Sequence, residues 1–305
     1  MRKTILMLLR SSLALILLTS VATAQTRTVA EKLGYPKEAK LLILHADDLG
    51  AAHSINATSF EALDKGAISS ASFMIPTPWI SEVAAYARAH PDADLGIHLT
   101  ITSEWDTYRW GSVLSKEKVP SLLDSAGTLA RDGDFVEKNA KRSEIESELR
   151  AQLDRARTLG IRTTHADSHM AVLFMNNDLF AIYARIARDN KIPFMTQTRD
   201  PRLLPGEAAV DTIIQAFPEI TADKWKQFYL DAIARLKPGV SEIIVHLGHD
   251  DAELKAVMVN HEPWGAAWRQ RDYDVVMSPE FKKALKDNNV ILVRWKDLQR
   301  TAQMR

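Results

Sequence analysis

Residues 41–50 constrain the fold of this chain more than any other stretch. They read Leu-Leu-Ile-Leu-His-Ala-Asp-Asp-Leu-Gly. Four consecutive aliphatic residues predict a strand buried on both faces, as in a parallel sheet covered by helices. Burying a carboxylate is unfavourable by several kcal/mol unless it is paired or binds a metal. A strand ending in Asp47-Asp48 therefore predicts a functional site; the alternative is an aspartate that caps the following helix.

The rest of the chain alternates between strand and helix patterns. Strands are expected at 41–48, 71–76, 94–101, 163–169, 193–197, 242–249 and 290–295. Helices are expected at 54–65, 80–89, 143–159, 178–190 and 279–288, with helical material between 206 and 237. Ser143 and Glu146 form a candidate capping box. This alternation predicts an α/β fold, a single irregular (β/α) barrel of about seven parallel strands. An open doubly wound sheet is the alternative.

The first 24 residues match a secretory signal peptide. Arg2-Lys3 precede an apolar stretch that includes 13–18, and Ala22-Thr23-Ala24 is a small-x-small cleavage site. We expect cleavage after Ala24 and a secreted or periplasmic protein, with a membrane anchor as the alternative. Residues 25–40 would be a polar lead-in to one domain at 41–300.

Charge and cysteine content exclude several classes of function. The chain has 39 basic and 39 acidic side chains, which gives no reason to expect a nucleic acid or an anionic membrane as partner. It has no cysteine, which excludes disulfides, thiol catalysis and cysteine-zinc sites. We therefore expect no nucleic acid partner and no membrane contact after signal cleavage. A homodimer and a monomer both stay open.

Polar residues of metal-binding type follow the predicted strands. Asp47 and Asp48 end the first strand, and His98, His169 and His246 lie toward the ends of later ones. In parallel α/β folds the carboxyl ends of strands meet at the active site. One carboxylate and two imidazoles form an open site for Zn, Mn, Co or Ni, whereas Mg prefers more oxygen. The second carboxylate is then a candidate general base.

Spacing ranks the histidines around residue 167. On an extended strand His165 and His169 would lie roughly 13 Å apart. They cannot readily bind one ion, so His169, nearer the strand end, is the better ligand. His165 or Asp167 would support the ligands from behind.

Other residues have two interpretations each. The segment 102–140 is polar and aromatic, as in a lid or binding loop. Four tryptophans are either saccharide-stacking surfaces or ordinary packing: Trp105, Trp110, Trp264 and Trp268. His45, Arg269, Arg271 and Asp272 are secondary candidates. The stretch 269–272 either binds sugar hydroxyls or is a solvated charged turn, and we favour the turn slightly.

Several ordered motifs resemble those of the YdjC-like carbohydrate deacetylases, which include chitooligosaccharide deacetylases. Residues 46–50 are similar to the family's Ala-Asp-Asp-Phe-Gly, and 96–99 to its Gly-(Ile/Met)-His-(Leu/Phe). Residues 164–169 resemble Thr-His-Leu-Asp-Ser-His. Weaker matches at 66–70 and 293–298 extend the resemblance from about 41 to 298.

The resemblance implies a distorted (β/α) barrel that removes an N-acetyl group from a saccharide. It implies a divalent metal ion (Mg, Zn, Mn, Co or Ni) held by Asp48, His98 and His169. It also implies Asp47 as the base that activates water and His246 as the acid that protonates the departing amine. The substrate would be a small molecule or an oligosaccharide.

Two departures from the family pattern leave alternatives open. Met170 follows His169 where members commonly have a second histidine. Residues 245–250 replace the usual Cys-His-Pro, so either His246 or His249 could be the acid. The alternative functions are metal-dependent hydrolysis of an ester or phosphate on the same scaffold, and non-catalytic saccharide binding.

Overall fold

A computed structural model describes residues 28–303; the predicted signal peptide lies outside them. Seven strands form one sheet with the order β4-β3-β2-β1-β6-β5, and β7 pairs with β1. Every pair is parallel. The strands are β1 Lys40–Leu49, β2 Ser70–Phe73, β3 Leu95–Leu99, β4 Ala166–Ser168, β5 Thr212–Ile214, β6 Gly239–Val245 and β7 Val290–Leu292.

The centre of the sheet is β1, the strand predicted from residues 41–48. It pairs with β6 from Lys40 to Ala46, with β7 over its first three residues, and with β2 toward its end. All its residues after Lys40 are buried. The prediction of a strand covered on both faces is therefore confirmed.

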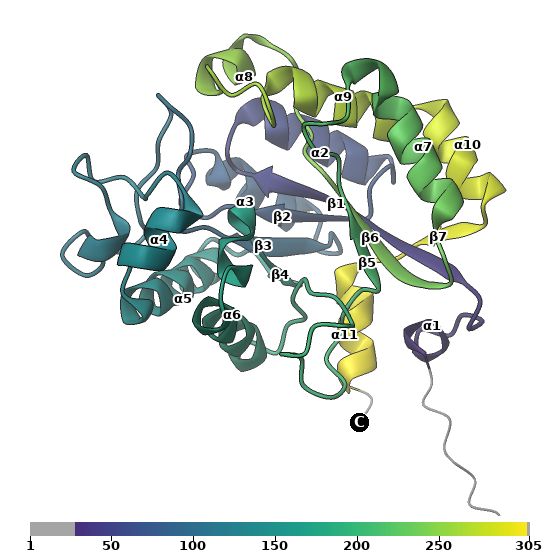
Figure 1. Cartoon of the computed structure of the whole chain (residues 1–305), viewed down its shortest axis with the longest axis horizontal. Coiled ribbons are helices and arrows are strands. Elements are labelled where there is room, and N and C mark those ends of the chain that lie inside the picture. The colour runs from purple at the N-terminus through teal and green to yellow at the C-terminus, as the bar shows by residue number, and fades with distance from the viewer. Residues whose placement is uncertain (1–27, 304–305) are drawn as a thin grey trace, which may run out of the picture.

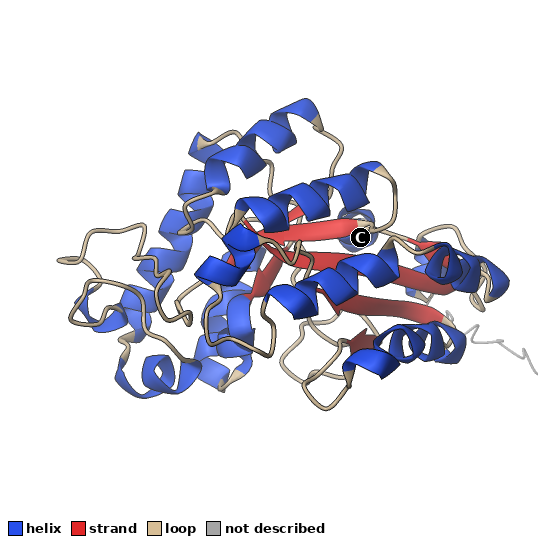
Figure 2. Cartoon of the chain, turned by 90° about the horizontal axis from the view of Figure 1, so that it is seen from above, coloured by secondary structure: helices blue, strands red, loops and turns tan. Residues whose placement is uncertain are grey.

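Helices cover both sides of the sheet. They are α1 Val29–Lys32, α2 His53–Asp64, α3 Ile80–Ala89, α4 Gly133–Asn139, α5 Arg142–Thr158, α6 Asn177–Asp189, α7 Trp225–Arg235, α8 Ala252–Val257, α9 Ala266–Val276, α10 Pro279–Asp287 and α11 Trp295–Gln303. Short 3-10 helices are η1 Pro120–Leu122, η2 His169–Phe174 and η3 Ala222–Lys224. Figure 1 shows α2, α7, α9 and α10 on one side and α5, α6 and α11 on the other. Figure 2 shows the strands gathered between the helices.

The sheet is a half-barrel of parallel strands, with β4 and β5 at the two ends of the strand order. About seven parallel strands were expected, and seven are found. They form an open half-barrel and not a closed barrel. The expected strand at 193–197 makes only single bridges, Ala166–Phe194 and Gln197–Val210. The fifth strand is instead Thr212–Ile214, inside a segment predicted to be helical.

Two local predictions are wrong for identifiable reasons. Helix α5 begins after Lys141, which caps it without a side-chain hydrogen bond, so Ser143 and Glu146 form no capping box. Glu146 pairs with Arg150 and Arg185 instead. The predicted polar lead-in contains α1, and its Ala30 is buried in a hydrophobic cluster.

The long irregular segment between β3 and α4 lies at the left of Figure 1, where the arrowhead of β1 points. This places the segment at the carboxyl edge of the sheet, where the site residues were expected. Among residues 28–303, no helix combines the length and the hydropathy needed to cross a membrane.

Candidate active site

A bulge at the end of β1 brings both aspartates to one site. The register with β2 shifts between Ala46 and Leu49, and Asp48 has a φ of 65°, a left-handed value that is uncommon outside glycine. Neighbouring side chains on a regular strand point to opposite faces. Bulges beside active sites commonly re-aim a side chain in this way. As a result, Asp47 and Asp48 both face His246 within a group of atoms no more than 4.8 Å apart.

The three predicted metal ligands converge. Asp48 Oδ1 lies 3.4 Å from His98 Nε2 and 3.4 Å from His169 Nδ1, and the two nitrogens lie 3.2 Å apart. All three residues are buried. They come from three separate strand ends, those of β1, β3 and β4. The structure therefore brings together the three residues that the sequence suggested as ligands.

This donor set fits a divalent cation. Asp48 Oδ1 is buried and accepts no hydrogen bond from any described residue. Tetrahedral coordination at about 2.1 Å puts ligand atoms roughly 3.4 Å apart, close to the spacing observed here. A carboxylate and two imidazoles with no fourth protein ligand in the group leave open positions for water and substrate.

Carboxylates behind the two histidines orient their rings. His98 Nδ1 lies 2.7 Å from Asp167 Oδ1, and His169 Nε2 lies 3.0 Å from Glu104 Oε2. His165 or Asp167 was expected to lie behind a ligand, and it is Asp167 that contacts His98. Although burial lowers the pKa of His169, Glu104 and Asp48 outweigh it and raise that pKa to about 9. The surrounding carboxylates therefore favour a positive charge at His169.

Asp47 and His246 form a second pair beside the ligand cluster. Asp47 Oδ1 lies 3.2 Å from His246 Nε2. Burial and the neighbouring Asp48 raise the pKa of Asp47 to about 7. Burial lowers the pKa of His246 to about 3. His249 lies elsewhere, with its ring against Tyr273 at 5.1 Å and its Nδ1 3.4 Å from Gln270 Oε1.

Helix α9 supports the site with two buried charges. The prediction of a solvated turn at 269–272 is wrong: Arg269 is 2% exposed and Asp272 is 1% exposed. Arg269 Nη2 donates to Asp48 Oδ2 at 2.7 Å, and its Nε donates to the Trp264 carbonyl at 2.9 Å. Asp272 Oδ2 accepts the backbone N–H of His246 at 2.9 Å. Arg271 points away, with its guanidinium 4.8 Å from the Trp225 ring centre.

The remaining histidine candidates lie beneath the site. His45 Nε2 is 3.1 Å from Asp167 Oδ2, so it contacts the carboxylate that holds His98. His165 is fully buried and stacks on Trp295. Neither belongs to the group of converging ligand atoms.

The four tryptophans divide between packing and the site. Trp105, Trp110 and Trp268 are 2–3% exposed, so they are core residues. Trp264 is partly buried, and its ring centre lies 4.9 Å from that of His246. Its outer neighbour is Phe217, which is 50% exposed. Trp264 alone of the four presents a surface near the Asp47–His246 pair.

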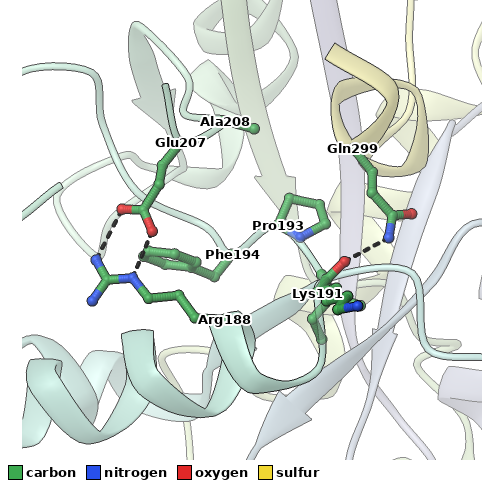
Figure 3. Close-up of a pocket in the computed structure, with 8 residues that line it drawn as sticks. Arg188, Lys191, Pro193, Phe194, Glu207, Ala208 and Gln299 are labelled. Carbon is green, nitrogen blue, oxygen red and sulfur yellow. Dashed lines mark hydrogen bonds and ion pairs between the residues drawn. The ribbon is translucent and has the colours of Figure 1, made fainter. Parts of the chain in front are cut away.

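A cavity of about 260 Å³ lies at α6 and α11 and contains none of these residues. Figure 3 shows its lining, with the Arg188–Glu207 ion pair and the Gln299 side chain bonded to the Lys191 carbonyl. The lining is mostly apolar and has no converging ligand atoms, so the cavity is separate from the site.

The family model described as YdjC-like protein matches residues 41–287. A carbohydrate deacetylase from Geobacillus stearothermophilus is 31% identical, and the match covers 70% of this chain and 81% of that protein. One from Thermus thermophilus is 30% identical, covering 81% and 89%. A chitooligosaccharide deacetylase from Serratia marcescens is 26% identical, covering 85% and 99%.

A solved structure shares the fold over nearly its whole length. It is a protein of Enterococcus faecalis V583 described as a candidate cellobiose-phosphate cleavage protein. Its TM-score is 0.73 at 26% identity, and the match covers 85% of this chain and 99% of that chain.

Proposed function

This chain belongs to the YdjC-like protein family, and we propose that it is a secreted, metal-dependent carbohydrate deacetylase. The reaction is hydrolysis of an N-acetyl amide on a saccharide, giving acetate and a free amine. The observation that carries the proposal is the convergence of Asp48 Oδ1, His98 Nε2 and His169 Nδ1 within 3.2–3.4 Å beside the Asp47–His246 pair. The carbohydrate deacetylases similar to this chain support the substrate class.

In this proposal Asp48, His98 and His169 hold the metal. When bound, a divalent ion supplies a Lewis acid for a carbonyl oxygen. Arg269 holds the other oxygen of Asp48, so that Oδ1 stays turned toward the histidines. Because the ligands come from buried strand ends, the geometry is set before substrate arrives.

Asp47 and His246 carry the proton transfers. A base works best with a pKa near the working pH, and the raised pKa of Asp47 meets that condition. Asp47 takes a proton from the attacking water as the new C–O bond forms. His246 is neutral in the free site because burial lowers its pKa. The 3.2 Å contact with Asp47 lets His246 relay this proton to the nitrogen as the C–N bond breaks, without holding the charge that its lowered pKa disfavours.

Trp264 lies beside His246, and the half-exposed Phe217 lies against the Trp264 ring. In the proposal they contact the sugar ring that carries the departing nitrogen, because aromatic side chains commonly line ligand sites and leave a few polar groups to orient the ligand.

The test separates the roles of the two adjacent aspartates. Purified protein is loaded with Zn²⁺, Mn²⁺, Co²⁺, Ni²⁺ or Mg²⁺ and screened for acetate and phosphate release from N-acetylated and phosphorylated saccharides. Asp48→Asn should lose metal, measured by elemental analysis. Asp47→Asn should keep metal and lose about 10²–10⁴-fold of the acetate release. Phosphate release without acetate release, or wild-type protein without bound metal, contradicts the proposal.

Secretion is proposed from the sequence of residues 1–24 alone. Expression of the full chain in a bacterium should yield an exported protein whose N-terminal residue is Gln25, measured by mass spectrometry. Retention of the uncleaved chain in the cytoplasm would contradict export.

A further inference from the structure

Glu104 lies in the irregular segment after β3 and faces the far side of His169. Its Oε2 is 3.0 Å from His169 Nε2, and its side chain is 12% exposed. The other ring nitrogen of His169, Nδ1, faces Asp48 Oδ1 and His98 Nε2. Glu104 thus contacts the proposed ligand from behind without joining the group of converging ligand atoms.

The chemistry of the two partners determines which nitrogen is free. A neutral imidazole has one N–H and one lone pair, and an ionised carboxylate can only accept. A histidine must be neutral to bind a metal, and in neutral His169 the nitrogen next to Glu104, Nε2, carries the hydrogen. This leaves the lone pair of Nδ1 for the ligand cluster. Asp167 does the same for His98, where it accepts from Nδ1 and frees Nε2.

The aromatic residues of the segment hold Glu104 in place. Trp105 is buried and packs edge-on against Trp110 at 5.3 Å. The Trp110 indole N–H donates to the Thr102 carbonyl at 2.9 Å, and its backbone N–H donates to Ser103 Oγ at 3.0 Å. These contacts hold residues on both sides of Glu104, by hydrogen bonds before it and by ring packing after it, so its carboxylate needs little further ordering to meet His169.

We propose that Glu104 is the positioning residue for His169, and that the segment between β3 and α4 thereby forms part of the metal centre. The inference rests on the proposed metal site and adds a residue to it. Partners of this kind typically change metal affinity by about 10- to 100-fold, because they fix the tautomer and raise the basicity of the ligand. The aromatic cluster predicted as a binding loop then acts as the support of a metal ligand.

The experiment compares Glu104→Ala and Glu104→Gln with the wild type. Co²⁺ affinity is measured by competition with a chromophoric chelator, and the visible spectrum of the Co²⁺-loaded protein reports the ligand geometry. Glu104→Ala should bind Co²⁺ about 10- to 100-fold more weakly with shifted absorption bands. In Glu104→Gln the side chain is nearly the same size and still accepts the hydrogen bond, so its Co²⁺ affinity should lie between those of the wild type and Glu104→Ala. This variant also keeps the test valid if Glu104→Ala fails to fold.

Asp106→Asn is the matched control. Asp106 lies two residues away and forms a half-exposed ion pair with Arg131 at 2.9 Å. It should leave the Co²⁺ affinity and spectrum unchanged. If both Glu104 variants match the wild type, the inference is overturned while the metal site stands. If the wild type binds no Co²⁺, the proposed function falls, and this inference with it.

Discussion

Arg269 donates a hydrogen bond from Nη2 to Asp48 Oδ2 at 2.7 Å, between residues 221 positions apart in sequence. Both side chains are buried. Burial alone would raise the pKa of Asp48, but the charge of Arg269 and the nearby His98 and His169 hold it well below its usual range. The carboxylate is therefore ionised, with one oxygen fixed and the other facing the ligand cluster.

Replacing Arg269 with Met should destabilise the metal-free protein. Breaking a buried ion pair leaves an uncompensated charge and costs about 3–5 kcal/mol. With chelator present, we expect the variant to unfold at a lower urea concentration than the wild type. Adding a divalent metal should restore part of this stability, because the ion returns positive charge to Asp48. Arg271→Met, two residues along α9, is the control because Arg271 contacts Trp225 instead. Equal urea midpoints for the Arg269 variant and the wild type would refute the role of the pair.

Asp272 should matter for both stability and activity. Its carboxylate accepts from Trp225 Nε1 at 2.8 Å, Tyr229 Oη at 2.7 Å and the His246 backbone at 2.9 Å. In Asp272→Asn an amide NH₂ replaces one accepting oxygen, so at least one buried donor loses its partner. Leaving such a donor unpaired lowers the free energy of unfolding by about 1–3 kcal/mol. We expect a lower free energy of unfolding and slower acetate release. Asp274→Asn, at an exposed position in the same helix, should change neither quantity. An Asp272 variant as stable and active as the wild type contradicts this.

Because His165 is buried, we expect the free energy of unfolding to fall in acid. Burial lowers its pKa to about 4, against about 6.5 in an unfolded chain. Between these values the unfolded state binds more protons, so stability is intact above pH 6.5 and falls as the pH drops toward 4. The contribution is about 2–3 kcal/mol between pH 7 and pH 4.5.

The non-titrating variant His165→Gln isolates this effect. Urea unfolding at both pH values, with chelator present throughout, gives the difference for each protein. The wild type should lose about 2–3 kcal/mol more than the variant on acidification. Parallel losses in the two proteins would show that His165 is not the group responsible.

Trp264 should affect substrate binding more than chemistry. Its ring lies beside His246, and its φ of 66° is held by the bond from Arg269 to its carbonyl. Removing an aromatic contact worth about 1 kcal/mol should raise KM about fivefold in Trp264→Ala. Trp264→Phe keeps an aromatic ring and should lie near the wild type. Steady-state kinetics on an N-acetylated saccharide measures this difference. An unchanged KM in Trp264→Ala would contradict a contact between Trp264 and the substrate.

Those site residues that belong to a local sequence pattern could be predicted from the sequence. Asp47, Asp48, His98 and His246 lie in or directly after aliphatic runs. His169 ends the weaker strand pattern at 163–169, and parallel strand ends must meet. Their convergence needs no knowledge of the loops. The aliphatic runs also predict β1, β2, β3 and β6 close to their observed positions.

The missed features depend on partners that are distant in sequence. Arg269 and Asp272 look solvated in an Arg-Gln-Arg-Asp stretch, because their burial depends on β1, β6 and α7 rather than on their neighbours. Glu104 gives no signal at all, since one acid in a polar segment is ordinary. Thr212–Ile214 is too short to reveal a strand, and its pairing with β6 supplies what the local pattern lacks.

The central position of β1 bears on when the protein can acquire its metal. β1 is synthesised early, but its neighbours β6 and β7 and the arginine on α9 come from the last third of the chain. None of these contacts can form until the last third of the chain has been synthesised. Asp48 therefore gains its charged partner only in the nearly complete chain. If the chain is exported before it folds, the metal supply of the destination compartment, rather than that of the cytoplasm, decides which ion it takes up.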